Sequence, residues 1–305
     1  MQRILSTAVI VGLLAATAAA FAITERLKLT KSPINGVKIV HAYVSPAAHS
    51  SAAIRVRTRR TDRVTATIRD GGGHEVDTLA YRVLEHHGWH AFRWNGRDDA
   101  GTAAKDGTYH LEVHFESQRR TILLPNPIVL ETKPPAVLEA GAVRPVFSPD
   151  FDHQSDTVTI HYRLSEQAHV LVFVDGKRII RGRSSKPEDK VSWNGKVDLK
   201  LLPPGRYVLT VSAADSAGNR ATKDKTVTVT LRYVTLEAKR VVVRAGGLLR
   251  IGVSTDAKRY HWALGSRHRT ASGKVLKLRA PSAAGTYRLT VSERGHDAVA
   301  TVVVR

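Results

Sequence analysis

A set of short motifs that occurs twice, in the same order, limits the possible folds of this chain more than any other feature of its sequence. The first copy holds Val44-Ser45-Pro46, Asp70-Gly71, Trp94-Asn95-Gly96 and Gly107-Thr108-Tyr109. The second copy holds Phe147-Ser148-Pro149, Asp175-Gly176, Trp193-Asn194-Gly195 and Gly205-Arg206-Tyr207. The offset stays at roughly a hundred residues, which indicates a duplicated structural unit. A weaker third copy is marked by Gly285-Thr286-Tyr287.

The segments around these motifs alternate apolar and polar residues or are rich in β-branched residues, which is typical of β-strands. They include residues 37–44, 52–58, 64–69 and 109–115 in the first copy, and 158–164, 170–174, 207–213 and 226–231 in the second. The third copy offers 240–244, 248–253, 275–278, 287–292 and 299–304. Turn signals recur at intervals of about 8 to 12 residues, as in Ig-like sandwiches. The predicted fold class is therefore all-β: tandem Ig-like antiparallel β-sandwiches after an N-terminal hydrophobic export or anchor helix.

The repeated aromatic residues are predicted to be structural. Trp94 and Trp193 are the largest side chains near the ends of their strands, where they suit the core of a sandwich. The Asn-Gly dipeptides that follow them favour tight turns, because both residue types tolerate a positive φ. Tyr109 and Tyr207 stand at strand starts, where a hydroxyl can reach back to the preceding chain.

The segment HAFRWNGRDDAGTAAKDGTYHLEV, residues 90–113, resembles the Ig-like domain of the bacterial flagellar hook-capping protein, FlgD, and its relatives in secreted proteins. The family pattern is matched by Trp94, Asn95, Gly96, Asp98, Gly101, Gly107 and Tyr109. The second copy keeps the Trp-Asn-Gly and Gly-x-Tyr parts but has a shorter, altered loop between them. Its opening, FSPDFDHQSDTVTI, also looks like the start of secreted Ig-like modules. Over residues 38–230 the resemblance implies an extracellular scaffold fold and does not imply hook assembly.

The N-terminus has the character of an export segment. No charged residue occurs over residues 4–24, a length close to the ~20 residues that cross a bilayer as a helix. Small-residue cleavage patterns occur at Ala18-Ala19-Ala20 and Ala20-Phe21-Ala22. Residues 1–32 are therefore predicted to be a signal peptide or an uncleaved signal anchor with a short linker. The basic residues Arg26, Lys28 and Lys31 argue against export by the positive-inside rule, but the modules that follow favour it.

Three predicted domains follow this segment. They are Ig-like domain 1 at residues 33–132, Ig-like domain 2 at 133–231 and Ig-like domain 3 at 232–305. Lys133-Pro134-Pro135 marks the first boundary, since two prolines favour a stiff, extended connector. The second boundary, near Arg232, has neither Pro nor Gly, so we expect the last strand of domain 2 to lead almost directly into domain 3.

Composition limits the possible partners. The chain has no cysteine, which excludes disulfides and Cys-ligated zinc. Its formal net charge is +20, which in an exported protein points to polyanions outside the cell, such as anionic wall polymers or glycans, and not to nucleic acid. The alternative is that the charge only keeps the chain soluble. No cofactor is expected, because the sequence contains no nucleophile elbow, no His-Glu-x-x-His and no phosphate loop.

Two groups of residues are candidate metal ligands. Asp150, Asp152 and Asp156 lie within one loop and could hold calcium through carboxylate oxygens. A solvated, Asp-capped turn without calcium dependence is the favoured alternative, because Phe151 and His153 occupy the expected glycine positions and calcium needs 6–8 oxygens. The second group is histidine-rich, comprising residues 85–90 and the alternating His110, Glu112 and His114. It is expected to be solvent-facing without zinc.

Arg55, Arg57 and Arg59 alternate along one predicted strand and are candidate polyanion contacts. A row of outward arginines also protects an edge strand from pairing with another chain, which is the simpler interpretation. We expect binding to polyanions to be weak, salt-dependent and without chemical specificity.

The sequence thus favours a non-catalytic bacterial cell-surface protein whose domains form a semi-rigid extracellular rod. The protein would be held in the cell membrane by a single N-terminal anchor with its domains outside, or secreted, and another surface protein is a possible partner. The first alternative is a binding module for anionic cell-wall polymer or glycan, which a cluster of basic and aromatic residues on one face would favour. The second alternative is an accessory domain array of an envelope enzyme complex.

Overall fold

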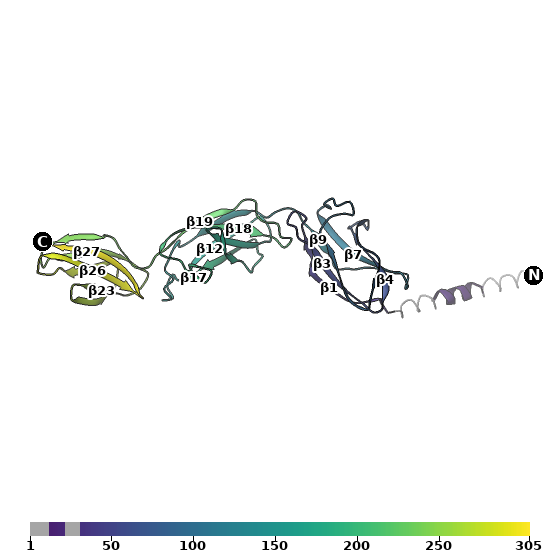
Figure 1. Ribbon diagram of the computed structural model, residues 1–305, viewed down its shortest axis with the longest axis horizontal. Helices are drawn as coiled ribbons and strands as arrows, with labels where there is room; N and C mark the ends of the chain where they lie inside the picture. The colour runs from purple at the N-terminus through teal and green to yellow at the C-terminus, as the bar shows by residue number, and fades with distance from the viewer. Residues whose placement is uncertain (1–11, 22–30) are drawn as a thin grey trace, which may run out of the picture. The chain divides into compact units, whose positions relative to one another are not determined.

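A computed structural model describes residues 12–21 and 31–305 of the chain. Residues 12–21 form a helix (Figure 1), and among the described residues there is no helix long and apolar enough to span a membrane. Residues 4–11 and 22–24 of the predicted export segment lie outside the described residues.

From residue 31 on, the described chain consists of strands, turns and loops, which confirms the all-β fold class. The strands form three successive pairs of sheets, and each pair encloses its own apolar core. By its internal contacts the chain separates into two compact units, with the division between Thr132 and Lys133. The first unit contains one sandwich and the second unit contains two.

The first sandwich has one sheet in the order β1-β3-β6 and a larger one in the order β2-β9-β7-β4-β5, with β8 also paired to β7 (Figure 1). The smaller sheet consists of β1 (Ile34–His41), β3 (Ala52–Thr58) and β6 (Gly88–Trp94). The larger sheet consists of β2 (Tyr43–Val44), β4 (Asp62–Arg69), β5 (Glu75–Glu85), β7 (Gly107–Phe115), β8 (Arg120–Leu123) and β9 (Ile128–Leu130).

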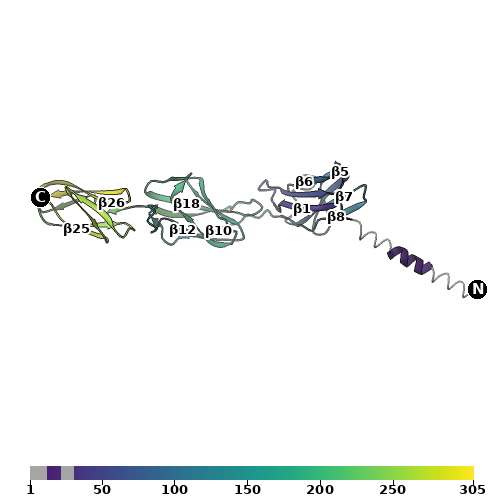
Figure 2. The same cartoon turned by 90° about the horizontal axis from the view of Figure 1, so that it is seen from below.

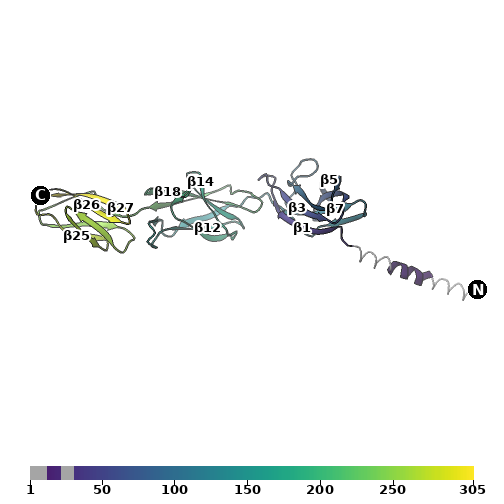
Figure 3. The ribbon, with the colours of Figure 1, turned by 60° about the horizontal axis from the view of Figure 1, so that its bottom comes forward.

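The second sandwich repeats this arrangement with sheets β10-β12-β15 and β11-β19-β18-β13-β14. Figure 3 shows β12 in one layer and β14 and β18 in the other. The first layer holds β10 (Val137–Ala142), β12 (Val158–Leu164) and β15 (Glu188–Trp193). The other layer holds β11 (Val146–Phe147), β13 (His169–Val174), β14 (Lys177–Arg181), β18 (Gly205–Ala214) and β19 (Lys225–Leu231), and a small hairpin joins β16 (Lys196–Val197) to β17 (Lys200–Leu201).

The third sandwich has the same strand order, β20-β22-β25 facing β21-β27-β26-β23-β24. Strands β25 and β26, from its two layers, can be followed in Figure 2. One layer holds β20 (Thr235–Leu236), β22 (Leu248–Ser254) and β25 (Val275–Arg279). The other holds β21 (Arg240–Val243), β23 (Tyr260–Leu264), β24 (Arg267–Ala271), β26 (Gly285–Glu293) and β27 (His296–Val304).

Each sandwich contains one parallel strand pair, which corrects the expectation of purely antiparallel sheets. The pairs are β2 with β9, β11 with β19, and β21 with β27. In each case the opening segment of the sandwich moves from the first layer to the other and joins the edge formed by the last strand. It then runs in the same direction as that strand.

The repeated tryptophans close the cores of the first two sandwiches. Trp94 and Trp193 are both buried, and their indole N–H groups donate to backbone carbonyls three residues later at 2.7 and 2.9 Å. Those carbonyls belong to the turns that the Asn-Gly dipeptides form. Each indole therefore fills the core with its apolar body and fastens the turn with its one polar atom.

The Gly-x-Tyr motif has the same role in all three sandwiches. The hydroxyls of Tyr109, Tyr207 and Tyr287 each donate to the carbonyl oxygen four residues earlier, at 2.6, 2.6 and 3.0 Å. Each hydrogen bond ties the start of a central strand to the loop before it. The third sandwich shares this feature although it lacks the Trp-Asn-Gly turn.

Gly195 occupies a position that no other residue type can take without strain. Its φ is +79°, in the left-handed region. A Cβ added there would lie 2.9 Å from Leu231 Cδ1 and 3.3 Å from Pro149 Cγ. A Cβ at this position would therefore add crowding against the side chains of Leu231 and Pro149 to the strain of the positive φ.

We expect Gly195→Ala to destabilise the second sandwich by about 2–4 kcal/mol, the sum of left-handed strain and overpacking. Gly176→Ala is the matched control, because Gly176 has a φ of +76° but nothing within 4 Å of its added Cβ. The control should cost only about 1–2 kcal/mol, the strain alone. Denaturant unfolding of the two full-length variants measures the difference in their free energies of unfolding. Equal losses of stability would show that the close contact at Gly195 contributes nothing.

Candidate functional site

A basic and aromatic surface covers the outer side of the sheet β1-β3-β6. It consists of Lys38, Arg55, Arg57, Trp89 and Arg93, all of them exposed. Strand register places these residues together, since Arg55 pairs with Lys38 on one side and with Ala91 on the other, and Arg57 pairs with Trp89. None of the three strands contains an acidic residue. We call this set of five residues the basic face.

Trp89 is the one aromatic side chain of the basic face. It is 44 % exposed, and the Arg55 guanidinium carbon lies 5.4 Å from its ring centroid, a cation–π arrangement. The end of its ring packs over Gly36, where a Cβ would lie 3.1 Å from the indole. Two neighbours thus contact the ring, and part of it remains exposed to solvent.

Two expectations about the arginines are wrong. β3 is the central strand of its sheet, paired with β1 and β6, so Arg55 and Arg57 do not protect an edge. Arg59 is not on the strand, because β3 ends at Thr58 and the chain bends there. The Arg59 side chain donates instead to the backbone carbonyl of Ser32 at 2.8 Å. The basic face therefore includes Arg55 and Arg57 but not Arg59.

The histidine-rich groups remain separate within the described part of the chain. His90 pairs with Glu85 and contacts the carbonyl of His86, whereas His110 contacts the carbonyl of Leu124. His114 contacts the Thr121 hydroxyl. Each of these three rings has its own local partner, and the two groups are not brought together as a metal cluster among the described residues.

An open hollow of roughly 930 Å³ in the first sandwich is lined by several carboxylates. Asp70 accepts from the backbone N–H groups of Gly72 and His74, and Asp98 accepts from that of Thr102. These hydrogen bonds to the backbone lower the pKa of Asp70. Asp70 and Asp98 therefore cap turns, whereas Glu75 pairs with Arg69 and accepts from the Thr78 hydroxyl.

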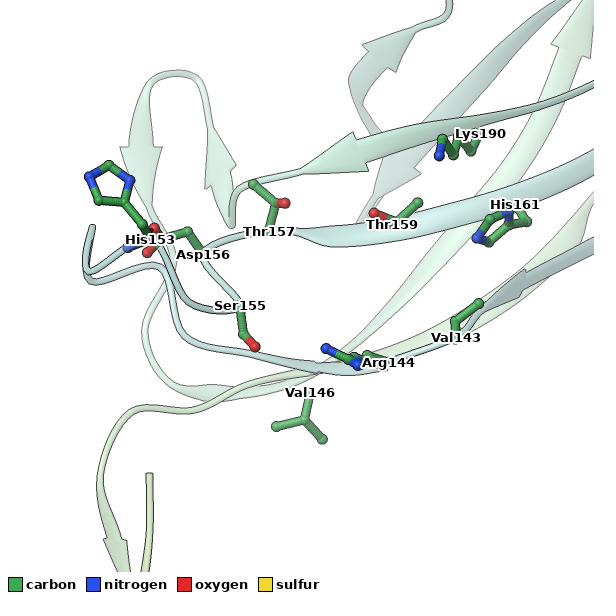
Figure 4. A pocket seen from close by; sticks show the side chains of 10 residues that line it. All are labelled: Val143, Arg144, Val146, His153, Ser155, Asp156, Thr157, Thr159, His161 and Lys190. Atoms are coloured by element: carbon green, nitrogen blue, oxygen red, sulfur yellow. Dashed lines mark hydrogen bonds between the residues drawn. The ribbon is translucent and has the colours of Figure 1, made fainter. Parts of the chain in front are cut away.

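A second open hollow, of roughly 620 Å³, lies beside β12 in the second sandwich (Figure 4). His153 and Asp156 stand at one end, and His161 and Lys190 stand at the other. The imidazoles are well separated, and Asp156 is engaged with the backbone of its own loop. The hollow brings no pair of these groups into a catalytic arrangement.

The loop between β11 and β12 holds the three aspartates singled out from the sequence, but it uses them differently. Asp156 accepts from the backbone N–H groups of Phe151 and His153 at 2.7 and 2.9 Å, so it caps the loop. Phe151 and His153 have φ values of +66° and +68°, the left-handed conformation that glycine would favour. Asp150 and Asp152 also accept from backbone N–H groups of this loop, those of Asp152 at 3.2 Å and Gln154 at 2.6 Å, and in addition they belong to another cluster.

Asp150, Asp152 and Glu293 form a carboxylate cluster, in which one oxygen from each residue lies within 4.8 Å of the others. Asp150 and Glu293 are 8 % and 5 % exposed. Glu293 ends β26 of the third sandwich, so the cluster joins a loop of the second sandwich to a strand of the third. The sequence grouped Asp156 with Asp150 and Asp152, but in the structure Glu293 is the third member of the cluster.

The carboxylates of this cluster strongly affect one another. Burial raises the pKa of Glu293 to about 7, and the negative charge of Asp150 adds to the rise, against a hydrogen bond of 2.9 Å from the Thr255 hydroxyl. Burial likewise raises the pKa of Asp256 to about 6, with contributions from the charges of Asp150 and Asp152. Asp256 follows β22 and is therefore a fourth carboxylate beside the cluster.

The sequence offered a signal for Glu293 and none for Asp256. Leu289 and Val291 point into the core from β26, so the same alternation places Glu293 on the buried side of the strand. Asp256 lies in a turn, where alternation gives no direction.

Comparison with known proteins confirms the predicted family resemblance over the first sandwich. Residues 44–118 match the family model of the FlgD Ig-like domain. This range contains the Trp-Asn-Gly turn and the Gly-x-Tyr motif on which the resemblance was based. Among the curated proteins, none matches the chain.

Several solved structures of Ig-like proteins are similar to the chain. The I-band fragment I67–I69 of titin is 13 % identical, with 90 % of this chain and 99 % of that chain covered and a TM-score of 0.30. FlgD from P. aeruginosa is 20 % identical over 32 % of this chain and 78 % of that chain, with a TM-score of 0.25. The Bacteroides ovatus protein SGBP-B, in complex with a mixed-linkage heptasaccharide, is 16 % identical over 89 % and 71 %, with a TM-score of 0.23. At these scores none of the three bears on function.

Proposed function

We propose that this chain is an exported, non-catalytic bacterial surface protein whose Ig-like sandwiches form a semi-rigid scaffold for interactions. The fold is consistent with a structural or interaction module, and FlgD-type Ig-like domains are generally non-catalytic. The uncharged run at residues 4–24 supports export, either as a cleaved signal or as a single membrane anchor.

The observation that carries the scaffold role is the direct join between the second and third sandwiches. Leu231 and Tyr233 belong to the core of the second sandwich, and Val234 belongs to the core of the third. No linker residue separates the two cores. The Tyr233 ring also stacks on His296 of β27, with centroids 3.4 Å apart and planes 6° from parallel.

A join of this kind resists bending, because any hinge motion must pull an apolar side chain out of a core. The Arg232 N–H donates a hydrogen bond of 3.0 Å to the carbonyl of Phe147, which holds the chain just before the join against the second sandwich. The second and third sandwiches would then act as one stiff segment of the scaffold.

Stiffness can be measured directly in the full chain, which has no native cysteine to interfere with labelling. Spin labels at Lys177→Cys and Arg269→Cys should give a narrow distance distribution between the second and third sandwiches. Three Gly-Ser residues inserted between Tyr233 and Val234 should broaden it. The same insertion at Gly273, in the turn before β25, is the control and should leave it narrow. A distribution that is already broad without the insertion would contradict the stiff join.

Export predicts a defined location and a defined N-terminus. Cell fractionation and N-terminal sequencing should find the chain outside the cytoplasm, either starting after Ala20 or Ala22 or uncleaved in the membrane fraction. Leu13→Arg should retain it in the cytoplasm, because arginine in the middle of an apolar segment costs about 2.5–3.5 kcal/mol on insertion. Leu199→Arg, at a 91 % exposed position, is the control and should be exported normally. Recovery of the unaltered chain in the cytoplasm would exclude the proposed role.

The basic face supports a second candidate function, a binding module for anionic glycan or wall polymer. Its cations gather around an aromatic ring on β6, beside the central strand β3, which is the basic and aromatic cluster that such a module requires. Non-specific attraction requires charge alone, whereas Trp89 adds a flat surface for stacking. A specific site of this kind would retain some binding at high salt.

Binding of the full chain to heparin over a salt series tests the basic face. Trp89→Ala should weaken binding at least about fivefold, roughly 1 kcal/mol, and should remove the binding that persists at high salt. Arg57→Ala should weaken binding more than Arg178→Ala, an exposed arginine of the second sandwich that serves as the charge-matched control. Equal losses for the two arginine variants, with no effect of Trp89→Ala, would show that the net charge alone attracts polyanions.

A further inference from the structure

We propose that a divalent cation of the size of calcium binds between the second and third sandwiches, held by the carboxylates of Asp150, Asp152 and Glu293 with Asp256 beside them. The proposal goes beyond the scaffold role, because the site depends only on the residues that line the join. The sequence alone favoured a solvated, Asp-capped turn at residues 150–156 over a calcium site. The structure adds the carboxylates of Glu293 and Asp256 from the third sandwich, and these favour the calcium site.

The donor atoms have the chemistry and spacing that calcium requires. All of them are carboxylate oxygens, hard ligands that select calcium or magnesium over transition metals. The contributing oxygens lie within 4.8 Å of one another. Calcium binds oxygen at 2.3–2.6 Å, so oxygens on opposite sides of one ion are up to about 5 Å apart, whereas magnesium at 2.0–2.1 Å draws them to about 4 Å.

Asp256 provides an observation that is independent of the cluster. Both of its carboxylate oxygens are buried, and neither accepts a well-aligned hydrogen bond within the described part of the chain. Burial raises the pKa of Asp256, and its own backbone N–H and the Ser148 hydroxyl lie near enough to offset part of that rise. Burying a carboxylate without a partner is costly, so the two oxygens are best explained as facing a positive charge.

Tyr233 provides a second such observation. Its side chain is 5 % exposed, and its hydroxyl has no hydrogen-bond partner among the described residues. Burial raises the pKa of this hydroxyl, and the nearby negative charge of Asp150 adds to the rise. An unsatisfied phenol and an unsatisfied carboxylate therefore border the same cluster.

One oxygen each from Asp150, Asp152 and Glu293 lies within 4.8 Å of the others, so three carboxylates share a small space. Carboxylates packed this closely repel one another, and a divalent cation turns that repulsion into shared coordination. Because the ligands come from both sandwiches, the bound ion would clamp the join.

Terbium luminescence provides a local test on the full chain. Terbium(III) accepts the same oxygen ligands as calcium, and excitation of the nearby Tyr233 should sensitise its emission. Calcium should displace terbium with an apparent Kd of about 10⁻⁴–10⁻³ M, the range of extracellular calcium modules. Tyr233→Phe should reduce the emission without abolishing displacement.

Thermal unfolding of the full chain tests the energetic consequence. Addition of 10 mM CaCl2, compared with NaCl of equal ionic strength plus chelator, should raise the unfolding temperature of the part after Lys133 by about 3–10 °C. MgCl2 should give a smaller rise. Glu293→Gln should abolish the calcium-dependent rise and should raise the unfolding temperature in chelator, because it removes one of the repelling charges. Asp152→Asn provides the same test if the buried substitution impairs folding.

Asp198→Asn is the matched control, since Asp198 is an exposed carboxylate of the second sandwich that pairs with Lys177. It should retain the calcium-dependent rise to within about 1 °C. The site is excluded if calcium gives no more stabilisation than NaCl, or if Glu293→Gln and Asp152→Asn respond to calcium as the unaltered chain does. An equal or larger rise with magnesium would overturn the assignment to calcium.

Discussion

The close approach of Gly195 to Leu231 and Pro149 is the constraint on which the second sandwich and its join depend. Leu231 is the last residue of β19, two residues before Tyr233, and Pro149 directly precedes Asp150. One glycine turn therefore packs against both the chain that leaves the sandwich and the loop that carries the acidic cluster. The first sandwich has the same contact, since a Cβ at Gly96 would lie 2.8 Å from Pro46 Cγ. The Trp-Asn-Gly turn thus packs against neighbouring chain segments at one end of each of the first two sandwiches.

Much of this fold could be predicted from the sequence because most strands have one buried and one exposed face. Residues 52–58 and 158–164 were predicted with the same bounds that the structure gives to β3 and β12, since their alternation is regular. β5 was not predicted. Its residues are nearly all partly or fully exposed and its pairing with β4 shifts register, so no alternation marks it. The parallel pairing of β2 was also beyond reach, because two residues carry no periodic signal.

The candidate-site residues could likewise be predicted where alternation marks them and could not where it does not. Alternation correctly placed Arg55 and Arg57 on an outward face, but it could not tell that β3 ends before Arg59. Whether a strand lies at an edge or at the centre of a sheet depends on which other strands pair with it, and single-strand patterns do not contain that information. Proximity in sequence could not show which carboxylates meet for a similar reason. Asp150, Asp152 and Asp156 all accept from backbone N–H groups of their loop, whereas Glu293 arrives from another domain.

The acidic cluster and the direct join have opposite effects on the spacing between the second and third sandwiches. Repelling carboxylates would be relieved if the two sandwiches moved apart, but Tyr233 and Val234 are fixed in separate cores and leave no slack in the chain. A proton satisfies only one of the crowded oxygens, whereas calcium accepts 6–8 and supplies two positive charges. Ion binding would therefore stabilise this join, whereas a flexible linker would let the charges separate without an ion. Apolar packing would then limit bending at the join, and ion binding would offset the electrostatic cost that the packing imposes.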